Sequence, residues 1–258
     1  MGLARAAAIL LLAAPLAAAA SEAGVALDRM PADVNPNDPV SLQRGAQVYV
    51  NYCLGCHGAS YMRYNRLADL GLNEQQIRDN LIFTGAKVGD LMRTAMDGNE
   101  AKAWFGVTPP DLTVIARSRS SSAGSGADWL YTYLRGFYRD PSRPSGWNNT
   151  VYPNVAMPHI LYALQGEQAL KTEVIAVPRG TKGDVTRHEI QKLELVKPGS
   201  MKPAEYDRMV ADLVNFLVYM GEPARRLRTE LGMYVLLFLG LLFGLAYALK
   251  KEFWKDVH

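Results

Sequence analysis

The sequence predicts a mainly α-helical domain with loop and β-hairpin insertions, followed by one C-terminal transmembrane helix. Apolar residues recur at helical spacing in several segments between residues 41 and 221, and irregular connections separate them. Two dense apolar runs lie near the ends, at residues 6–20 and 231–249. The 258 residues are enough for one sizeable core or two small ones.

Residues 1–20 are predicted to be a cleaved secretory signal peptide. A short basic start precedes the apolar run, which ends in an Ala-x-Ala pattern at residues 18–20. A first transmembrane helix is the alternative, but the run is short, rich in alanine and interrupted by Pro15. Residues 21–224 are therefore expected to be the exported domain.

The second apolar run predicts a membrane anchor at residues 225–250. Its uncharged centre, residues 231–249, would span about 28 Å as a helix, close to the thickness of a bilayer's hydrocarbon core. Basic residues flank both ends, so they do not orient the helix, whereas export of the preceding domain does. Residues 251–258 are expected to form a cytoplasmic tail.

Start and stop signals divide the exported domain into helices and one hairpin. A segment rich in Pro and Asn, residues 25–40, precedes them. Positive and negative charges in the domain are nearly balanced, so the sequence gives no indication of a basic face that would bind nucleic acid. Turn residues at 178–184 between two β-rich segments, residues 172–177 and 188–196, predict the hairpin. Helices are expected at residues 41–52, 74–83, 88–97, 127–139 and 203–221.

The two cysteines of the chain, Cys53 and Cys56, stand in the pattern C-x-x-C followed by His57. A disulfide between them would close a very short loop and stabilise little. A thioredoxin-like redox dithiol would lie in a βαβ unit, and the sequence shows no such pattern. A zinc site needs four ligands, and the chain has no second pair of cysteines. The pattern C-x-x-C-H is typical of c-type haem attachment, in which two thiols bind the vinyl groups and the histidine binds iron. The sequence therefore predicts one covalent haem c.

Met157 is the expected sixth ligand of the iron. It lies in NVAMPHI, an irregular stretch ahead of Pro158, and His159 is the competing candidate. A thioether opposite a histidine raises the reduction potential, and a second histidine lowers it. Four other methionines are expected on helices, at positions that favour packing: Met92, Met96, Met209 and Met220.

Motifs over nearly the whole chain resemble the cytochrome c1 family of proteobacterial type, which implies a c-type cytochrome domain. They are RGAQVYVNYCLGCHGASYMRYNRL, TPPDLTVIARSRS, GADWLYTYLRGFY, YPNVAMPHI and DLVNFLVYMGEPARRLR. The long separation of His57 from Met157 and the single C-terminal anchor agree with the same family.

The resemblance implies roles for eight residues. Cys53 and Cys56 would hold the haem, and His57 and Met157 would ligate its iron. The remaining four would surround the ring: Pro109 and Pro110 packed on it, Arg119 facing a propionate, and Trp129 as an aromatic near that propionate.

From the residues alone, these four assignments stay open. The TPPD segment is a rigid turn because each proline fixes φ, so it suits either a wall of the haem or an ordinary loop corner. Arg119 could bind a carboxylate through its fork of donors or lie solvated at the surface. The aromatic helix at residues 127–139 is expected to be mostly core.

With a histidine and a methionine on the iron, no position is open for a substrate, which indicates outer-sphere electron transfer. The resemblance implies a subunit of a cytochrome bc1 complex, in which quinol chemistry belongs to partner subunits. Electrons would come from a Rieske iron–sulfur protein and go to a soluble cytochrome c. Cytochrome b, membrane lipid and a dimeric complex are the other implied partners, in the bacterial inner membrane with the haem domain in the periplasm.

Two alternatives of other kinds remain at this point. One is a haem enzyme or gas sensor in which Met157 is absent from the iron or displaceable. The other is a membrane-anchored cytochrome that serves a terminal oxidase.

Overall fold

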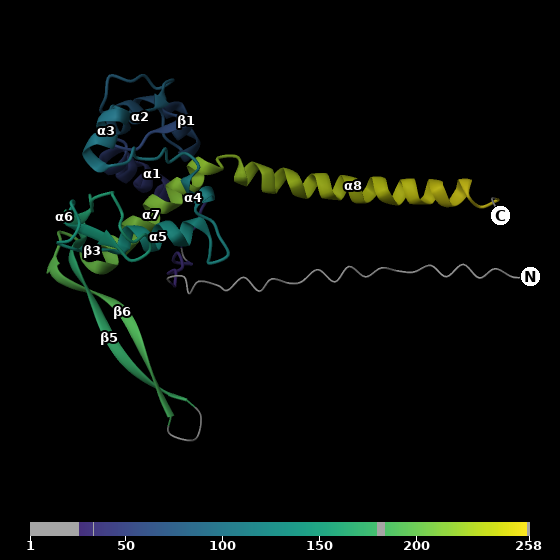
Figure 1. Ribbon diagram of the computed structural model, residues 1–258. Coiled ribbons are helices and arrows are strands. Elements are labelled where there is room, and N and C mark those ends of the chain that lie inside the picture. The colour runs from purple at the N-terminus through teal and green to yellow at the C-terminus, as the bar shows by residue number, and fades with distance from the viewer. Residues whose placement is uncertain (1–25, 33, 180–183, 257–258) are drawn as a thin grey trace, which may run out of the picture.

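The computed structural model describes residues 26–32, 34–179 and 184–256 (Figure 1). The expected signal peptide, residues 1–20, lies outside the described residues. Helices pack around α7 (Pro203–Gly221), while a long hairpin and the C-terminal helix α8 (Arg225–Phe253) project away from this body (Figure 1). The expected fold class is confirmed: a mainly α domain with hairpin insertions and one apolar C-terminal helix.

Short helices and strands connect in an irregular order around that body. The other helices are α1 (Pro39–Val48), α2 (Glu74–Leu81), α3 (Gly98–Phe105), α4 (Ile115–Ser118), α5 (Gly126–Arg135) and α6 (Tyr162–Gln165). A π-helical turn (Tyr49–Cys53) continues α1, and a 3₁₀ helix (Tyr64–Leu70) precedes α2. Each antiparallel sheet has two strands: β1 (Ala59–Arg63) with β2 (Leu91–Met92), β3 (Phe137–Arg139) with β4 (Trp147–Asn149), and β5 (Gly166–Arg179) with β6 (Asp184–Pro198).

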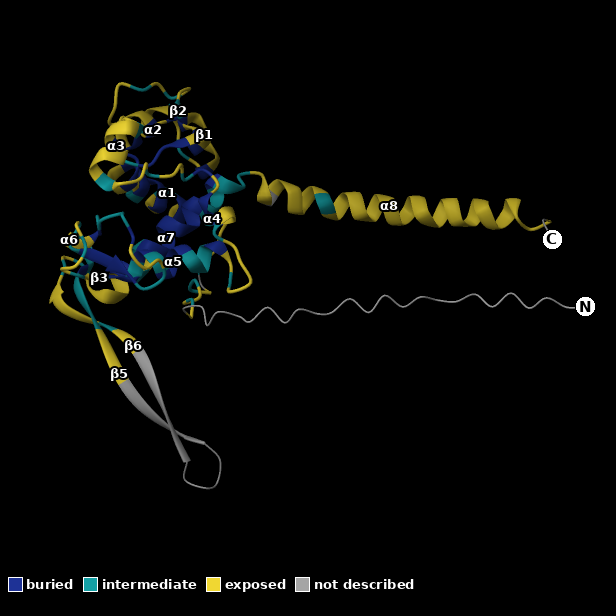
Figure 2. Cartoon of the chain, in the orientation of Figure 1, coloured by how far each residue is buried: buried dark blue, intermediate teal, exposed yellow. Residues whose placement is uncertain are grey.

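Helix α1 crosses α7 at very short range, at Gly45. A Cβ atom at this position would lie 2.1 Å from the carbonyl oxygen of Asp212, so only glycine fits. The buried Asp212 carboxylate accepts hydrogen bonds from Ser41 Oγ at 2.6 Å and from Arg44 Nε at 2.6 Å. Figure 2 shows this crossing as the buried centre of the domain. The contact fixes α1, whose C-terminal end carries the cysteine motif.

Helix starts in the structure agree with the capping signals of the sequence. The Asp38 side chain accepts from the backbone N–H of Val40, and Pro39 opens α1. Asn73 and Gln76 form a capping box at the start of α2. The structure confirms the helices expected at residues 74–83 and 203–221. It also confirms the expected hairpin, whose strands are longer than predicted.

The expected helix at residues 88–97 is wrong. This segment contains the short strand β2, and Asp97 caps the next helix by accepting from the N–H groups of Asn99 and Glu100. The glycine taken as a helix stop, Gly98, is the first residue of α3. Met92 is buried, as its expected packing role requires, but it lies on the strand β2 and not on a helix.

The expected helix at residues 127–139 ends early, at Arg135. Gly136 breaks it, and its carbonyl oxygen accepts from the N–H of Thr150. Phe137 then pairs with Asn149 in the β3–β4 sheet. This early turn into a strand brings α5 beside the segment that contains Met157.

The C-terminal helix α8 is long and apolar enough to be the expected anchor. Its segment Leu227–Phe253 has a mean hydropathy of 2.1, and none of its most apolar window is buried in the domain. At 1.5 Å per residue a helix of this length reaches about 40 Å, more than the hydrocarbon core needs. One helix long and apolar enough to cross a membrane is thus present among the described residues.

Replacing Gly45 by alanine should loosen the α1–α7 crossing. Because the added methyl group meets backbone rather than a flexible side chain, we expect Gly45→Ala to lower the free energy of unfolding by about 1–3 kcal/mol. Thermal unfolding of the purified full chain measures this. Gly85→Ala, where nothing lies within 4 Å of the added atom, is the matched control. Equal unfolding midpoints for the two variants would contradict a tight crossing at Gly45.

Removing the anchor should leave a water-soluble domain, since α8 contributes nothing to the buried core. A chain that stops after Ala224 is expected to keep its fold and to partition into the aqueous phase after cell lysis. Fractionation followed by immunodetection measures this. Retention of that fragment in washed membranes would reveal another lipid-contacting segment.

Candidate functional site

The cysteine motif lies at the end of α1, where a π-helical turn ends at Cys53. The backbone carbonyl oxygen of Cys53 accepts from the N–H groups of Cys56 at 3.0 Å and His57 at 2.8 Å, which folds the motif into a tight turn. Cys53 is buried, Cys56 is half-buried, and no disulfide joins them. Burial raises the pKa of the Cys53 thiol to about 12, so an unmodified thiol at this position is protonated at neutral pH.

His57 is held in one tautomer. Its Nδ1 atom lies 2.7 Å from the carbonyl oxygen of Pro110, and because a carbonyl only accepts, Nδ1 carries the proton. The lone pair is thereby left on Nε2, the atom that can bind a metal. Burial lowers the pKa of His57, which also favours the neutral ring that ligation requires. Tyr49 Oη donates to the His57 carbonyl oxygen at 2.8 Å and fixes the backbone.

The expected Pro109–Pro110 wall lies against the motif. The N–H of Leu112 donates to the carbonyl oxygen of Gly58 at 2.9 Å, and the Asp111 carboxylate accepts from the N–H of Ser60 at 2.6 Å. These bonds join the proline turn to the residues that directly follow His57. Pro109 and Pro110 therefore lie beside His57, at a place that a wall of the haem would occupy.

These segments line an apolar cleft. His57 and Met157 both line it, although they are far apart in the sequence. Its walls are almost free of polar surface, as a porphyrin face requires. The lining residues are Cys56, His57, Phe105, Val107, Pro109, Pro110, Ala156, Met157, Pro158 and Ile160.

Met157 belongs to a loop shaped by two asparagine side chains of β4. Asn149 Oδ1 accepts from the N–H groups of Val151 and Tyr152, and Asn148 Oδ1 accepts from the N–H of Asn154. Asn154 has φ = 62°, a left-handed conformation that asparagine tolerates better than most residues. The loop thus holds its shape without helix or strand hydrogen bonds, and it presents Met157 to the cleft.

His159 packs into an aromatic cluster and is not among the residues that line the cleft. Its ring stacks on Phe137 with centroids 4.8 Å apart and meets Trp147 edge-on at 5.0 Å. Burial lowers the pKa of His159 to about 4, so the ring is neutral. The geometry therefore favours a packing role for His159.

Arg119 and Trp129 are brought together, as expected. The guanidinium carbon of Arg119 lies 4.6 Å from the centre of the Trp129 ring and 5.7 Å from that of Tyr152. Arg119 Nε is buried and has no hydrogen-bond partner among the described residues. A buried, unpaired donor on a cation is costly, and a carboxylate such as a haem propionate would satisfy it. The residues present therefore fit a haem.

Sequence reasoning missed Tyr133 as a residue of the site. It lies on α5, and its hydroxyl donates to Met157 Sδ at 3.4 Å. Burial raises the pKa of Tyr133, which keeps the hydroxyl protonated as a donor. The sequence did offer a pattern that could have indicated this role, because Trp129, Tyr133 and Phe137 are spaced four residues apart. The aromatic residues of this segment were instead expected to be mostly core.

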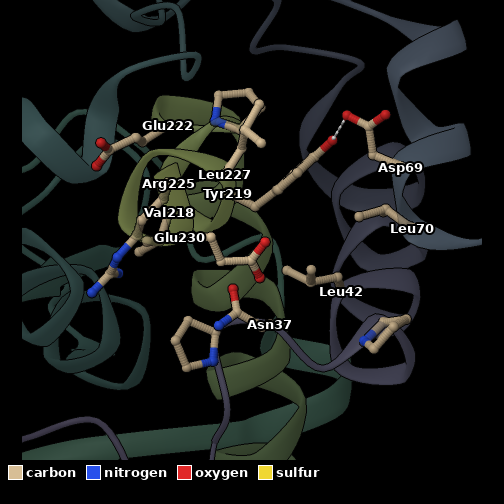
Figure 3. A pocket seen from close by; sticks show the side chains of 13 residues that line it. Asn37, Leu42, Asp69, Leu70, Val218, Tyr219, Glu222, Arg225, Leu227 and Glu230 are labelled. Atoms are coloured by element: carbon tan, nitrogen blue, oxygen red, sulfur yellow. Dashed lines mark hydrogen bonds between the residues drawn. The ribbon is translucent and has the colours of Figure 1, made fainter. Parts of the chain in front are cut away.

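A larger cleft lies elsewhere, where α8 leaves the domain (Figure 3). Leu42 of α1 and Leu227 of α8 point into it, and the Tyr219 hydroxyl lies 3.0 Å from an Asp69 carboxylate oxygen. None of the expected site residues lines this cleft. It lies where α8 meets the domain, whereas the expected residues His57 and Met157 line the apolar cleft.

Comparison with known proteins identifies the family. The model of the cytochrome C1 family matches residues 33–88 and 82–257. A protein of Allochromatium vinosum named cytochrome c1 is 51% identical over 96% of each chain, and cytochrome c1 of Rhodospirillum rubrum is 29% identical over 93% of this chain and 92% of its own length. A homologue from Nitrosomonas europaea with a different name, ammonia monooxygenase gamma subunit, is 53% identical over 96% of each chain.

Both the family match and the relatives named cytochrome c1 extend over nearly the whole chain, and not over the cysteine motif alone. The C-terminal anchor is included in the matched residues. The chain therefore belongs to the cytochrome c1 family, carries one covalently bound haem c, and is the electron-transfer subunit of a membrane-bound bc1 complex that also contains cytochrome b.

Proposed function

We propose that Cys53 and Cys56 attach the haem, and that His57 Nε2 and Met157 Sδ are the two axial ligands of its iron. One observation carries the assignment: a single apolar cleft contains Cys56, His57 and Met157, from segments about a hundred residues apart. The Nδ1 hydrogen bond of His57 supports the ligand role of Nε2. The packing of His159 against Phe137 supports Met157 over its competitor.

The chain's residues hold and insulate the site, and no residue is required to move a proton. When bound, the haem supplies a one-electron Fe(III)/Fe(II) couple. With His57 and Met157 as its two protein ligands, the iron would leave no position open to a substrate, and the haem would exchange electrons by outer-sphere transfer. A thioether ligand and a dry apolar cleft both favour the less charged Fe(II) state, which gives a high potential.

The remaining four expected residues are proposed to surround the ring. Pro109 and Pro110 form one apolar wall, and the Pro110 carbonyl oxygen orients His57. Arg119 pairs with a propionate through its buried Nε, and Trp129 holds the guanidinium in place.

We further propose the direction of transfer and its setting. A Rieske iron–sulfur protein is the donor and a soluble cytochrome c is the acceptor, within a dimeric complex of the bacterial inner membrane. Residues 21–224 form the periplasmic haem domain, residues 225–250 the lipid-contacting anchor and residues 251–258 the cytoplasmic tail. The signal-like pattern at residues 1–20 and the exposed apolar surface of α8 support this placement.

Loss of both thiols should abolish covalent attachment. We expect Cys53→Ala combined with Cys56→Ala to remove all haem that stays with the polypeptide through denaturing gel electrophoresis, as measured by haem staining. Met157→Leu is the matched control, because it alters an iron ligand and leaves both thioethers, so its band should still stain. A stained band in the double cysteine variant would refute attachment at this motif.

Loss of the sulfur ligand should lower the potential. Met157→Leu keeps a similar volume and is expected to lower the midpoint by more than about 59 mV, the equivalent of a tenfold change for one electron. The reduced protein should also become reactive with carbon monoxide. Redox titration and optical spectra measure both effects.

His159→Phe is the matched control for this experiment. It preserves the aromatic packing against Phe137 and Trp147 and removes both ring nitrogens. The low-spin spectrum and the midpoint should stay close to those of the parent chain. If this variant lost the low-spin spectrum while Met157→Leu kept it, His159 would be the ligand.

A further inference from the structure

Tyr133 makes a contact that the role of Met157 as a ligand does not by itself explain. Its hydroxyl donates to Met157 Sδ with an oxygen–sulfur distance of 3.4 Å. A thioether is a weak acceptor, and a largely buried tyrosine hydroxyl normally pairs with a stronger one. The contact joins α5 to the irregular loop that follows β4.

The tyrosine ring is held on both sides. It stacks on Trp129 with centroids 4.9 Å apart and planes 13° from parallel, and it meets Phe137 edge-on at 5.2 Å. Trp129 and Tyr133 lie four residues apart on one face of α5, so the helix sets their alignment, and Phe137 follows on β3. The hydroxyl therefore has a fixed position relative to the cleft.

The backbone on each side of the oxygen–sulfur contact is fixed by one side chain. Asn149 Nδ2 donates to the carbonyl oxygen of Tyr133 at 2.7 Å. The Oδ1 atom of the same asparagine accepts from the N–H groups of Val151 and Tyr152, at the start of the Met157 loop. Asn149 therefore contacts both the backbone of the donor, Tyr133, and the loop of the acceptor, Met157, which helps to fix the distance between them.

We propose that Tyr133 is a positioning residue that raises the reduction potential by hydrogen bonding to the sulfur of Met157. This inference rests on the proposed ligation of iron by Met157. A donated hydrogen bond withdraws electron density from the sulfur. Fe(III) needs that density more than Fe(II) does, so the hydrogen bond disfavours the oxidised state. The same effect weakens the sulfur–Fe(III) bond.

A role in packing alone predicts a different result. If Tyr133 only filled space, loss of its hydroxyl would loosen the Met157 loop and make the sulfur easier to displace. The electronic role predicts that the sulfur binds Fe(III) more strongly once the hydroxyl is removed. The two roles therefore differ in the sign of one measurable affinity.

Tyr133→Phe in the full holoprotein separates these roles, because it keeps the ring and removes the hydroxyl. We expect the equilibrium constant for reduction to fall by about three- to tenfold, a midpoint shift of about 30–60 mV at 59 mV per tenfold change. Imidazole should bind the ferric protein several-fold more weakly than it binds the parent. An unchanged or raised midpoint, or tighter imidazole binding, would overturn the proposal.

Tyr131→Phe is the matched control. It removes a hydroxyl from the same helix, two residues away, where the centre of the ring lies 4.4 Å from the Arg135 guanidinium carbon, whereas the Tyr133 hydroxyl contacts Met157 Sδ. Its midpoint and imidazole affinity should equal those of the parent chain. Shifts as large as those of Tyr133→Phe would show that any hydroxyl loss in α5 has this effect and would overturn the assignment.

A double variant shows whether Tyr133 acts through Met157. In a Met157→Leu background, Tyr133→Phe should shift the midpoint no further. A further shift of the same size would overturn the proposal while leaving the ligand assignment intact. If Met157→Leu alone left spectrum and midpoint unchanged, the ligand assignment itself would fail, which is a distinguishable outcome.

Discussion

Helix α1 can approach α7 as closely as it does because residue 45 has no side chain, and the haem site depends on that approach. The buried Asp212 carboxylate holds Ser41 and Arg44 of α1 at this crossing. The π-helical turn at the end of α1 then carries Cys53 and leads into His57. A shift of α1 would move His57 relative to Met157, which lies on the other side of the cleft.

The cleft combines an apolar interior with polar contacts that all lie behind its walls. His57 turns its protonated nitrogen away, toward the Pro110 carbonyl oxygen, and Met157 receives a hydrogen bond from Tyr133. Arg119 keeps a buried nitrogen that the described residues leave unpaired. Under the proposed ligation, an apolar cleft would favour a low charge on the iron, and Arg119 would be available to pair with a propionate.

Local spacing in the sequence carries part of the account. C-x-x-C-H predicts haem attachment and one iron ligand within five residues, and the apolar run at residues 231–249 predicts the long apolar helix that the structure contains. Asn73 and Asp38 marked their helix starts correctly because a cap is a local hydrogen bond. The choice of Met157 over His159 came from its irregular surroundings, and the stacking of His159 on Phe137 now supports it.

Other features depend on contacts between distant segments and could not be predicted from local spacing. The helix expected at residues 88–97 has apolar residues at suitable intervals, but pairing with β1 makes part of it a strand. The aromatic helix was expected to extend through Arg139, yet Gly136 ends it and Phe137 pairs with Asn149. That turn brings Tyr133 into contact with Met157, and it depends on pairing between β3 and β4, which local spacing does not reveal.

X-ray absorption at the iron edge of the purified ferric protein tests the central claim most directly, because it identifies the elements bound to the metal. We predict a coordination shell that contains sulfur in addition to nitrogen, and loss of the sulfur in Met157→Leu. A shell of nitrogen alone, or of nitrogen and oxygen, in the parent chain would contradict ligation by His57 and Met157. It would also remove the structural basis for a relay of high potential.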